Sequence, residues 1–168
     1  MTTPAESPEY ALASAAIAAL SADAQLAPLT LPEVLDNSSA VGRLALAAAQ
    51  GPGCIAVMPQ DAITADSEST SIGLLRVRCA LGIFSTRADA AGASRIPSLY
   101  AVTGRAAAVI TAANWSTLGI PYLRPRIESI SPLPTADFEG LANLIGRLII
   151  FSRIVNYKAF YGIADLEL

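Results

Sequence analysis

The residue types that most enzymes use for acid–base chemistry and metal binding are scarce in this sequence. It has no histidine, the commonest general base near neutral pH and the commonest ligand for transition metals. Its two cysteines, Cys54 and Cys79, show no CxxC spacing, so a zinc site would lack both ligands and geometry. We expect both thiols to be buried as small hydrophobic side chains. The sequence therefore predicts no catalytic residues, no metal and no cofactor.

Carboxylates could still carry acid–base catalysis, and their densest group is formed by Asp61, Asp66 and Glu68. This group lies in a stretch rich in serine and threonine, without the apolar surroundings that shift pKa values. We therefore predict a solvated acidic loop or interaction arm over residues 59–71. A small carboxylate-based enzyme remains an alternative, and it would require a deep pocket lined by these three side chains.

Arginines provide the most regular chemical pattern in the sequence. Ten of the eleven cations are arginines, and three pairs of them each fall on one side of a predicted strand. One interpretation is an exposed sheet face whose charges protect the edges from pairing. The other is a subunit contact, in which acidic residues of a neighbouring copy meet the guanidinium groups. The candidate subunit interface consists of the three pairs and the acidic group: Arg76, Arg78, Arg124, Arg126, Arg147, Arg153, Asp61, Asp66 and Glu68.

The overall composition bears on what surrounds the protein. Charged residues make up 15% of the chain, against about 25% in an ordinary soluble domain. We therefore expect another molecule to cover part of the protein surface. The net charge of −3 argues against nucleic-acid binding as the main source of affinity. The strongest apolar run, 141–151, contains Arg147 and predicts no membrane span. The acidic start of the chain lacks the features of a secretory signal, so we expect a cytoplasmic protein.

The helices and strands that would position these residues follow from periodicity. Ser7 as N-cap and Pro8 in the first turn predict a helix at the start of the chain. For residues 144–157 both helix and strand fit, and the β-branched content favours a strand. We expect helices over 7–23, 39–50 and 98–113, strands over 54–59, 72–85, 122–130 and 144–157, connections over 28–37 and 131–137, and a flexible start over 1–6.

Together these elements predict one domain over residues 1–168 of the α/β (α+β) class. The sheet is expected to be mixed and mostly antiparallel, with four to five strands and two to three helices packed on it. The strand over 54–59 is a short, continuously apolar run and should be buried on both faces.

The order of these elements resembles the tail-terminator (tail completion or neck) proteins of long-tailed bacteriophages. The matching segments are SPEYALASAAIAALSAD as the opening helix, GPGCIAVMP as the first strand, LLRVRCALGIF as the second, the helix over 98–113, and LIGRLIIFSRIV as the closing strand. The resemblance spans most of the chain. It implies a structural virion subunit without catalytic residues.

The resemblance further implies a homo-oligomer, expected to be a hexameric ring, that caps the tail tube and joins the tail to the neck. Its partners would be the tail tube protein and the neck or connector proteins, with DNA passing through the lumen without sequence readout. The protein would be assembled in the host cytoplasm and end in the virion. The alternatives are another head–tail connector or head-completion component, the carboxylate-based enzyme, and a monomeric regulatory binding module.

Overall fold

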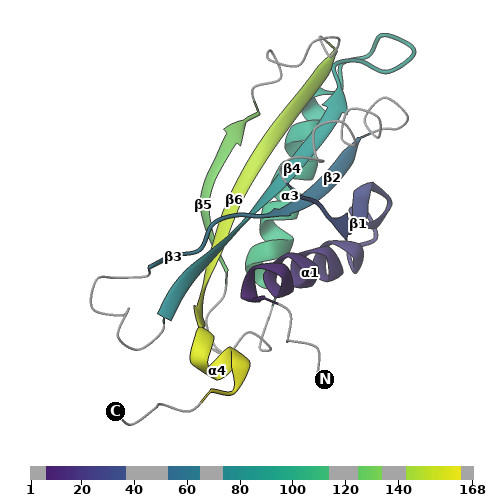
Figure 1. The fold of residues 1–168 in the computed structure, drawn as a ribbon. Coiled ribbons are helices and arrows are strands. Elements are labelled where there is room, and N and C mark those ends of the chain that lie inside the picture. The colour runs from purple at the N-terminus through teal and green to yellow at the C-terminus, as the bar shows by residue number, and fades with distance from the viewer. Residues whose placement is uncertain (1–6, 37–52, 65–73, 114–124, 134–142, 164–168) are drawn as a thin grey trace.

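The computed structural model describes residues 7–36, 53–64, 74–113, 125–133 and 143–163 (Figure 1). Its sheet has the strand order β1-β2-β4-β6-β5, with β3 pairing beside β4. β1 runs parallel to β2 and every other pairing is antiparallel, which confirms the predicted α/β class with a mixed, mostly antiparallel sheet. The strands are β1 (Thr30–Val34), β2 (Cys54–Pro59), β3 (Ile63–Thr64), β4 (Leu74–Thr86), β5 (Arg126–Pro132) and β6 (Leu144–Asn156).

The centre of the sheet is the antiparallel pair of β4 and β6. The two strands pair over their whole length, from Leu74 opposite Asn156 to Thr86 opposite Leu144. Alternation along both strands places successive side chains on opposite faces, as the sequence pattern predicted. The choice of a strand over 144–157 is therefore confirmed, with the last paired residue at Asn156.

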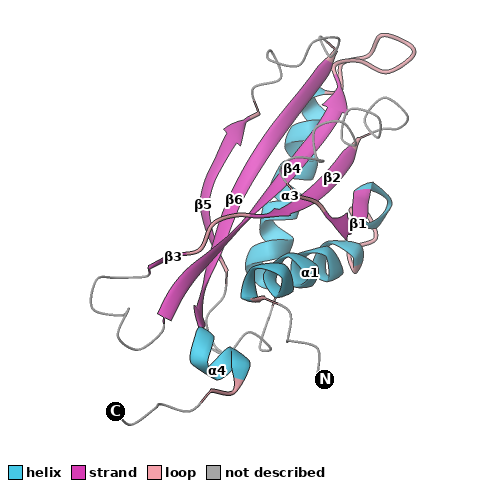
Figure 2. Ribbon diagram, in the orientation of Figure 1, coloured by secondary structure: helices cyan, strands magenta, loops and turns pink. Residues whose placement is uncertain are grey.

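One face of the sheet carries the main hydrophobic core. α1 (Pro8–Ser21) and α3 (Ile96–Ala112) pack on this face, which we call the helix face (Figure 2). Fully burying one leucine, isoleucine or phenylalanine side chain contributes about 1.5–3 kcal/mol. The helix-face core includes Leu12, Leu20, Ile55, Leu81, Ile110, Ile149 and Phe151. We call the other side the opposite face; its smaller buried cluster comprises Leu35, Cys54, Ala56, Met58, Ala80, Phe84 and Leu144.

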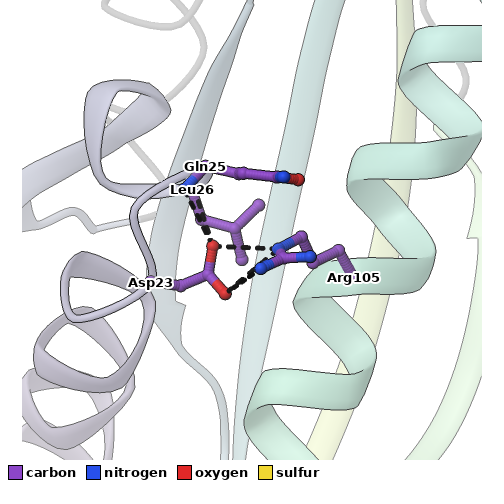
Figure 3. A network of polar contacts seen from close by, with 4 residues as sticks. All are labelled: Asp23, Gln25, Leu26 and Arg105. Atoms are coloured by element: carbon purple, nitrogen blue, oxygen red, sulfur yellow. Dashed lines mark hydrogen bonds and ion pairs between the residues drawn. The ribbon is translucent and has the colours of Figure 1, made fainter.

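Side-chain hydrogen bonds that the sequence encodes begin α1 and shape the turn that follows it. The Ser7 hydroxyl accepts a hydrogen bond from the Tyr10 backbone N–H at 3.2 Å, and Pro8 follows at the first helical position, as predicted. After the helix, Asp23 accepts hydrogen bonds from the backbone N–H groups of Gln25 and Leu26 (Figure 3). The same carboxylate pairs with Arg105 of α3, with Nη2 to Oδ2 at 2.8 Å. This contact ties the end of α1 to α3.

The Asp23 carboxylate should titrate at an unusually low pH. Hydrogen bonding to Arg105 holds the pKa of Asp23 below its ordinary value near 3.8. A lowered pKa in the folded state means that the contact stabilises the fold above the unfolded pKa and is lost as the pH falls through the folded pKa. We expect NMR titration to show the carboxyl ionising below pH 3.8 in the native chain. In Arg105→Gln its midpoint should rise, and an unchanged midpoint would contradict the pairing.

One helix begins earlier than expected, and another was not expected at all. α3 begins at Ile96 instead of residue 98, because Pro97 suits the first turn of a helix. The short α4 (Tyr157–Tyr161) was not predicted. Its boundaries are nevertheless encoded: the Asn156 side chain accepts a hydrogen bond from the Ala159 N–H, and Gly162 ends the helix with φ 65°.

Three expected connections were partly wrong. A 3-10 helix (Ala27–Leu29) extends into residues 28–37, and β1 follows it. Pro32 is tolerated in β1 because this strand lies at the end of the sheet order. The expected acidic loop contains β3, which pairs with Leu75 and Arg76 of β4. β5 continues to Pro132, so the connection expected from residue 131 begins later.

Several expectations fall outside the described residues: the helix over 39–50, the flexible start over 1–6, and the ends of strands at 72–73 and 122–124. The strand over 54–59 is confirmed, and five of its six residues are buried. Within the described ranges, no helix has the length and apolar character needed to cross a membrane.

Candidate functional site

Arginines from two strands meet on the opposite face of the sheet. Arg78 and Arg126 both lie opposite Ser152 of β6, so one row crosses β4, β6 and β5. Arg78 Nε donates to Glu128 Oε2 at 2.8 Å, and Arg76 Nη1 donates to Ser152 Oγ at 3.3 Å. Ser152 is completely buried beneath them. We call these five residues the arginine cluster.

The arginine cluster fixes the ionisation of its one carboxylate. Burial alone would raise the pKa of Glu128, but hydrogen bonds from Ser152 and Arg78 and the positive charges of Arg78 and Arg76 hold it below its ordinary value. The Arg78 side chain is 34% exposed, so solvent screens the pair, and its net contribution to stability is about 0.2–1 kcal/mol. With three guanidinium groups and one carboxylate, the cluster carries a net positive charge.

The arginine pair on β6, Arg147 and Arg153, lies on the helix face. The Arg147 guanidinium carbon lies 4.5 Å from the centre of the Tyr100 ring, and its Nη1 donates to the Tyr100 hydroxyl at 3.2 Å. Such a cation–π contact contributes about 0.5–1 kcal/mol at an exposed site. Arg147 Nε is buried and finds no hydrogen-bond acceptor among the described residues. Arg147 therefore holds Tyr100 in one orientation.

Arg153 overturns the interpretation of all the arginines as an exposed face. It is only 2% exposed, and burial lowers the pKa of its guanidinium. Alternation had placed it correctly on the side of Ile149 and Phe151, but that side is covered by the helices. A buried Arg153 cannot protect an edge from pairing, so its charge belongs to the interior of the subunit.

Among the described residues, no ion pair joins an acidic member of the predicted interface to its arginines. Asp61 is exposed between β2 and β3, in a segment that runs beside Arg76 and Arg78 of β4. Asp66, Glu68 and Arg124 lie outside the described residues. The contact between these carboxylates and the arginines of a second copy stays a prediction.

An exposed apolar surface was missed by the sequence reasoning. Ile96 and Tyr100 of α3 are 44% and 56% exposed, and Ile130 of β5 is 42% exposed. Ile130 lies opposite Ile149 and Pro132 lies opposite Arg147, which places the β5 residues beside the Tyr100 contact. We call Ile96, Tyr100, Ile130 and Arg147 the α3–β5 patch. The sequence does contain a signal for this surface. Ile96 and Tyr100 are one helical turn apart and lie off the predicted apolar stripe, so both side chains would share an exposed side of the helix.

Both cysteines are buried and not disulfide-bonded, which confirms their predicted role as small hydrophobic side chains. Burial raises the pKa of Cys54 to about 11. Burial, with the charge of Glu9, raises the pKa of Cys79 to about 12. Because the thiolate is the nucleophile, neither side chain suits covalent catalysis.

We expect both thiols to resist labelling in the folded protein. At pH 8 a thiol reagent such as 5,5′-dithiobis(2-nitrobenzoate) should react slowly with the native chain and release two equivalents of chromophore in denaturant. Each Cys→Ser single variant keeps one thiol, so it should release one equivalent of chromophore in denaturant and serves as the calibration. Rapid labelling of the folded chain would contradict the buried, protonated state of the thiols.

Two hollows of the structure bear on the carboxylate-based alternative. The first is a small, partly open hollow of about 20 Å³ between α3 and strands β2 and β4, with room for about one water molecule. The second is an open hollow of about 400 Å³ between α1 and β1. Asp61 lines neither of them, and the part of the chain that is described holds no group of three metal-ligating side chains.

Comparison with known proteins adds no assignment to this geometry. No protein-family model matches the chain, and no curated protein sequence matches it.

Proposed function

We propose that this protein is a structural subunit that associates with its own copies, as a ring of the tail-terminator type on a phage tail. The observation that carries the proposal is the α3–β5 patch. It places an exposed tyrosine, an arginine stacked on it and two exposed isoleucines together on one side of the subunit. Tyrosine and arginine are the residue types enriched where protein surfaces bind one another.

The chemistry of the described residues supports the same proposal. The two cysteines are buried and protonated, and the one carboxylate of the arginine cluster is already engaged by Arg78. A low charged fraction of 15% is consistent with a surface that neighbouring subunits cover. In this role the ring would cap the tail tube and meet the neck, and DNA would pass through its lumen without base contacts.

Size-exclusion chromatography with light scattering tests the association directly. We expect a mass of several copies for the purified chain, alone or after mixing with the tail tube protein, and closed rings in negative-stain images. The number of subunits is expected to be six. A strict monomer at every concentration, both alone and with that protein, would overturn the proposed function.

A further inference from the structure

The α3–β5 patch combines exposed apolar side chains with a positive charge. Ile96, Tyr100 and Ile130 supply the apolar surface, and Arg147, stacked on the Tyr100 ring, supplies the charge. Among the described residues, no ion pair neutralises Arg147. Opposite charges on facing surfaces favour correct association and set its orientation. The patch therefore suits a partner segment that carries apolar and acidic side chains together.

The connection beside the patch adds further positive charge. Arg87 is exposed where β4 ends, and Arg95 Nη1 donates to Thr86 Oγ1 at 3.0 Å just before α3 begins. The carboxylate of this connection, Asp89, accepts two backbone hydrogen bonds at 2.9 Å within its own turn. Two arginines and one carboxylate next to Arg147 make the surroundings of the patch favourable for an acidic partner.

Residues 164–168 have a sequence of this kind. After Ile163, the last residue that the structure describes, the chain continues as ADLEL. In these five residues Asp165 and Glu167 alternate with Leu166 and Leu168. We call residues 164–168 the acidic–leucine segment. Its leucines match the apolar side chains of the patch, and its two carboxylates match the positive charge.

The acidic–leucine segment cannot reach the patch of its own subunit. The Ile163 N–H donates to the Lys158 carbonyl oxygen at 2.9 Å, so Ile163 lies beside α4 at the end of β6 (Figure 1). Arg147 is nine residues before Asn156 on β6, which is about 30 Å along a strand. Five fully extended residues span at most about 18 Å. Only the segment of another copy can therefore lie on this patch.

We propose that the acidic–leucine segment of one copy docks on the α3–β5 patch of the next. Its two leucines cover Tyr100, and its two acidic residues lie beside Arg147. The contact joins two different surfaces, so it is head-to-tail and generates a closed ring if the rotation between copies closes. The inference rests on the proposed function and adds to it the two surfaces that meet.

Crosslinking between two variants, each with one added cysteine, tests which surfaces meet. Ala164→Cys places a thiol in the segment and keeps its leucines and acidic residues, and Ile96→Cys places one in the patch and keeps Tyr100. The native thiols are buried and should stay silent. With a short bifunctional maleimide, we expect crosslinked pairs of chains when the two variants are mixed. An oligomeric mixture without crosslinked pairs would overturn the inference.

A matched control uses Ser129→Cys, an exposed position on β5 that pairs with Ile150 and belongs to the opposite face. Mixed with Ala164→Cys, it should give no crosslinked pairs. Equal crosslinking from Ser129→Cys and Ile96→Cys would show random collision instead of a specific contact, and would overturn the inference.

A chain that carries both Ala164→Cys and Ile96→Cys tests the reach of the segment. Assembled with a large excess of native chain, it has neighbours without added thiols. We therefore expect no crosslink within this chain. An internal crosslink would show that the segment docks on its own subunit, and would overturn the head-to-tail arrangement.

Substitution of the two leucines tests the energetic weight of the contact. Leu166→Ser together with Leu168→Ser should raise the dissociation constant of the assembly at least about tenfold, which corresponds to about 1.4 kcal/mol. The control is Ile63→Ser, which replaces an isoleucine of β3 that is 44% exposed and lies outside the patch. It should leave association unchanged. Sedimentation equilibrium of the three chains measures the constants.

The charge contact has its own readout. Asp165→Arg together with Glu167→Arg should weaken association, and adding Arg147→Glu should recover it. An oligomeric native chain that is indifferent to the leucine substitutions, with no crosslink between Ala164→Cys and Ile96→Cys, would overturn this inference and leave the proposed function standing. A monomeric native chain would overturn both.

Discussion

Replacing Phe151 by alanine is expected to lower the free energy of unfolding by about 3–5 kcal/mol. Phe151 is completely buried on β6, where it lies opposite Cys79 on β4 and Ile127 on β5. The substitution removes the largest apolar side chain of the helix-face core and leaves a cavity between three strands and the helices. The strands on both sides limit how far the surroundings can relax, so most of the cavity should persist.

Urea or guanidinium unfolding followed by circular dichroism measures this loss. The control is Ile163→Ala, an apolar residue beyond α4 that is 57% exposed, for which the change should stay within about 0.5 kcal/mol. A loss of less than about 1 kcal/mol for Phe151→Ala would mean that the site is not packed as described.

Gly53→Ala is expected to destabilise the protein by about 1–3 kcal/mol from backbone strain, with a further loss from a steric clash. Gly53 has φ 141°, a conformation that other residues rarely adopt. A Cβ atom there would lie 2.7 Å from the carbonyl oxygen of Phe84 on β4. Because that oxygen is backbone, relief would require β2 and β4 to move apart where Cys54 pairs with Phe84.

The control is a glycine whose replacement by alanine should raise the stability of the protein. Gly104 lies in α3, and a Cβ added there meets nothing within 4 Å. Gly104→Ala should therefore stabilise the protein by about 0.5–1 kcal/mol through helix propensity. Thermal and denaturant unfolding of both variants checks the pair, and a neutral Gly53→Ala would show that the start of β2 is not held as described.

The elements that the sequence predicted well are those in which one periodicity extends over many residues. β4 and β6 alternate for 13 residues each, and α1 has both a capping serine and a proline in place. β1 was missed because it has only five residues and contains Pro32. A short segment with a proline is typical of a connection between elements. Its strand character depends on pairing with β2, which is a tertiary contact and cannot be seen in local pattern.

The candidate site was predictable only in part, for a related reason. Alternation placed each arginine pair on one side of its own strand, but it does not tell how the faces of β4 and β6 correspond or which face the helices cover. Glu128 joined the arginine cluster through an irregularity of β5 between Ile127 and Ser129, which no local rule locates. The exposure of Tyr100 likewise depends on how α3 lies against the sheet.

The β4–β6 pairing has a consequence for how the chain acquires its structure. Thr86 pairs with Leu144 and Leu74 with Asn156, so the two central strands meet only across a long intervening segment. Such distant contacts slow folding, because the entropy lost in closing the loop precedes the gain from pairing. During translation, the edge of β4 that pairs with β6 stays unpaired until β6 has left the ribosome. Its apolar surface is then open to chaperones and to self-aggregation, and low temperature during expression should improve the yield of soluble protein.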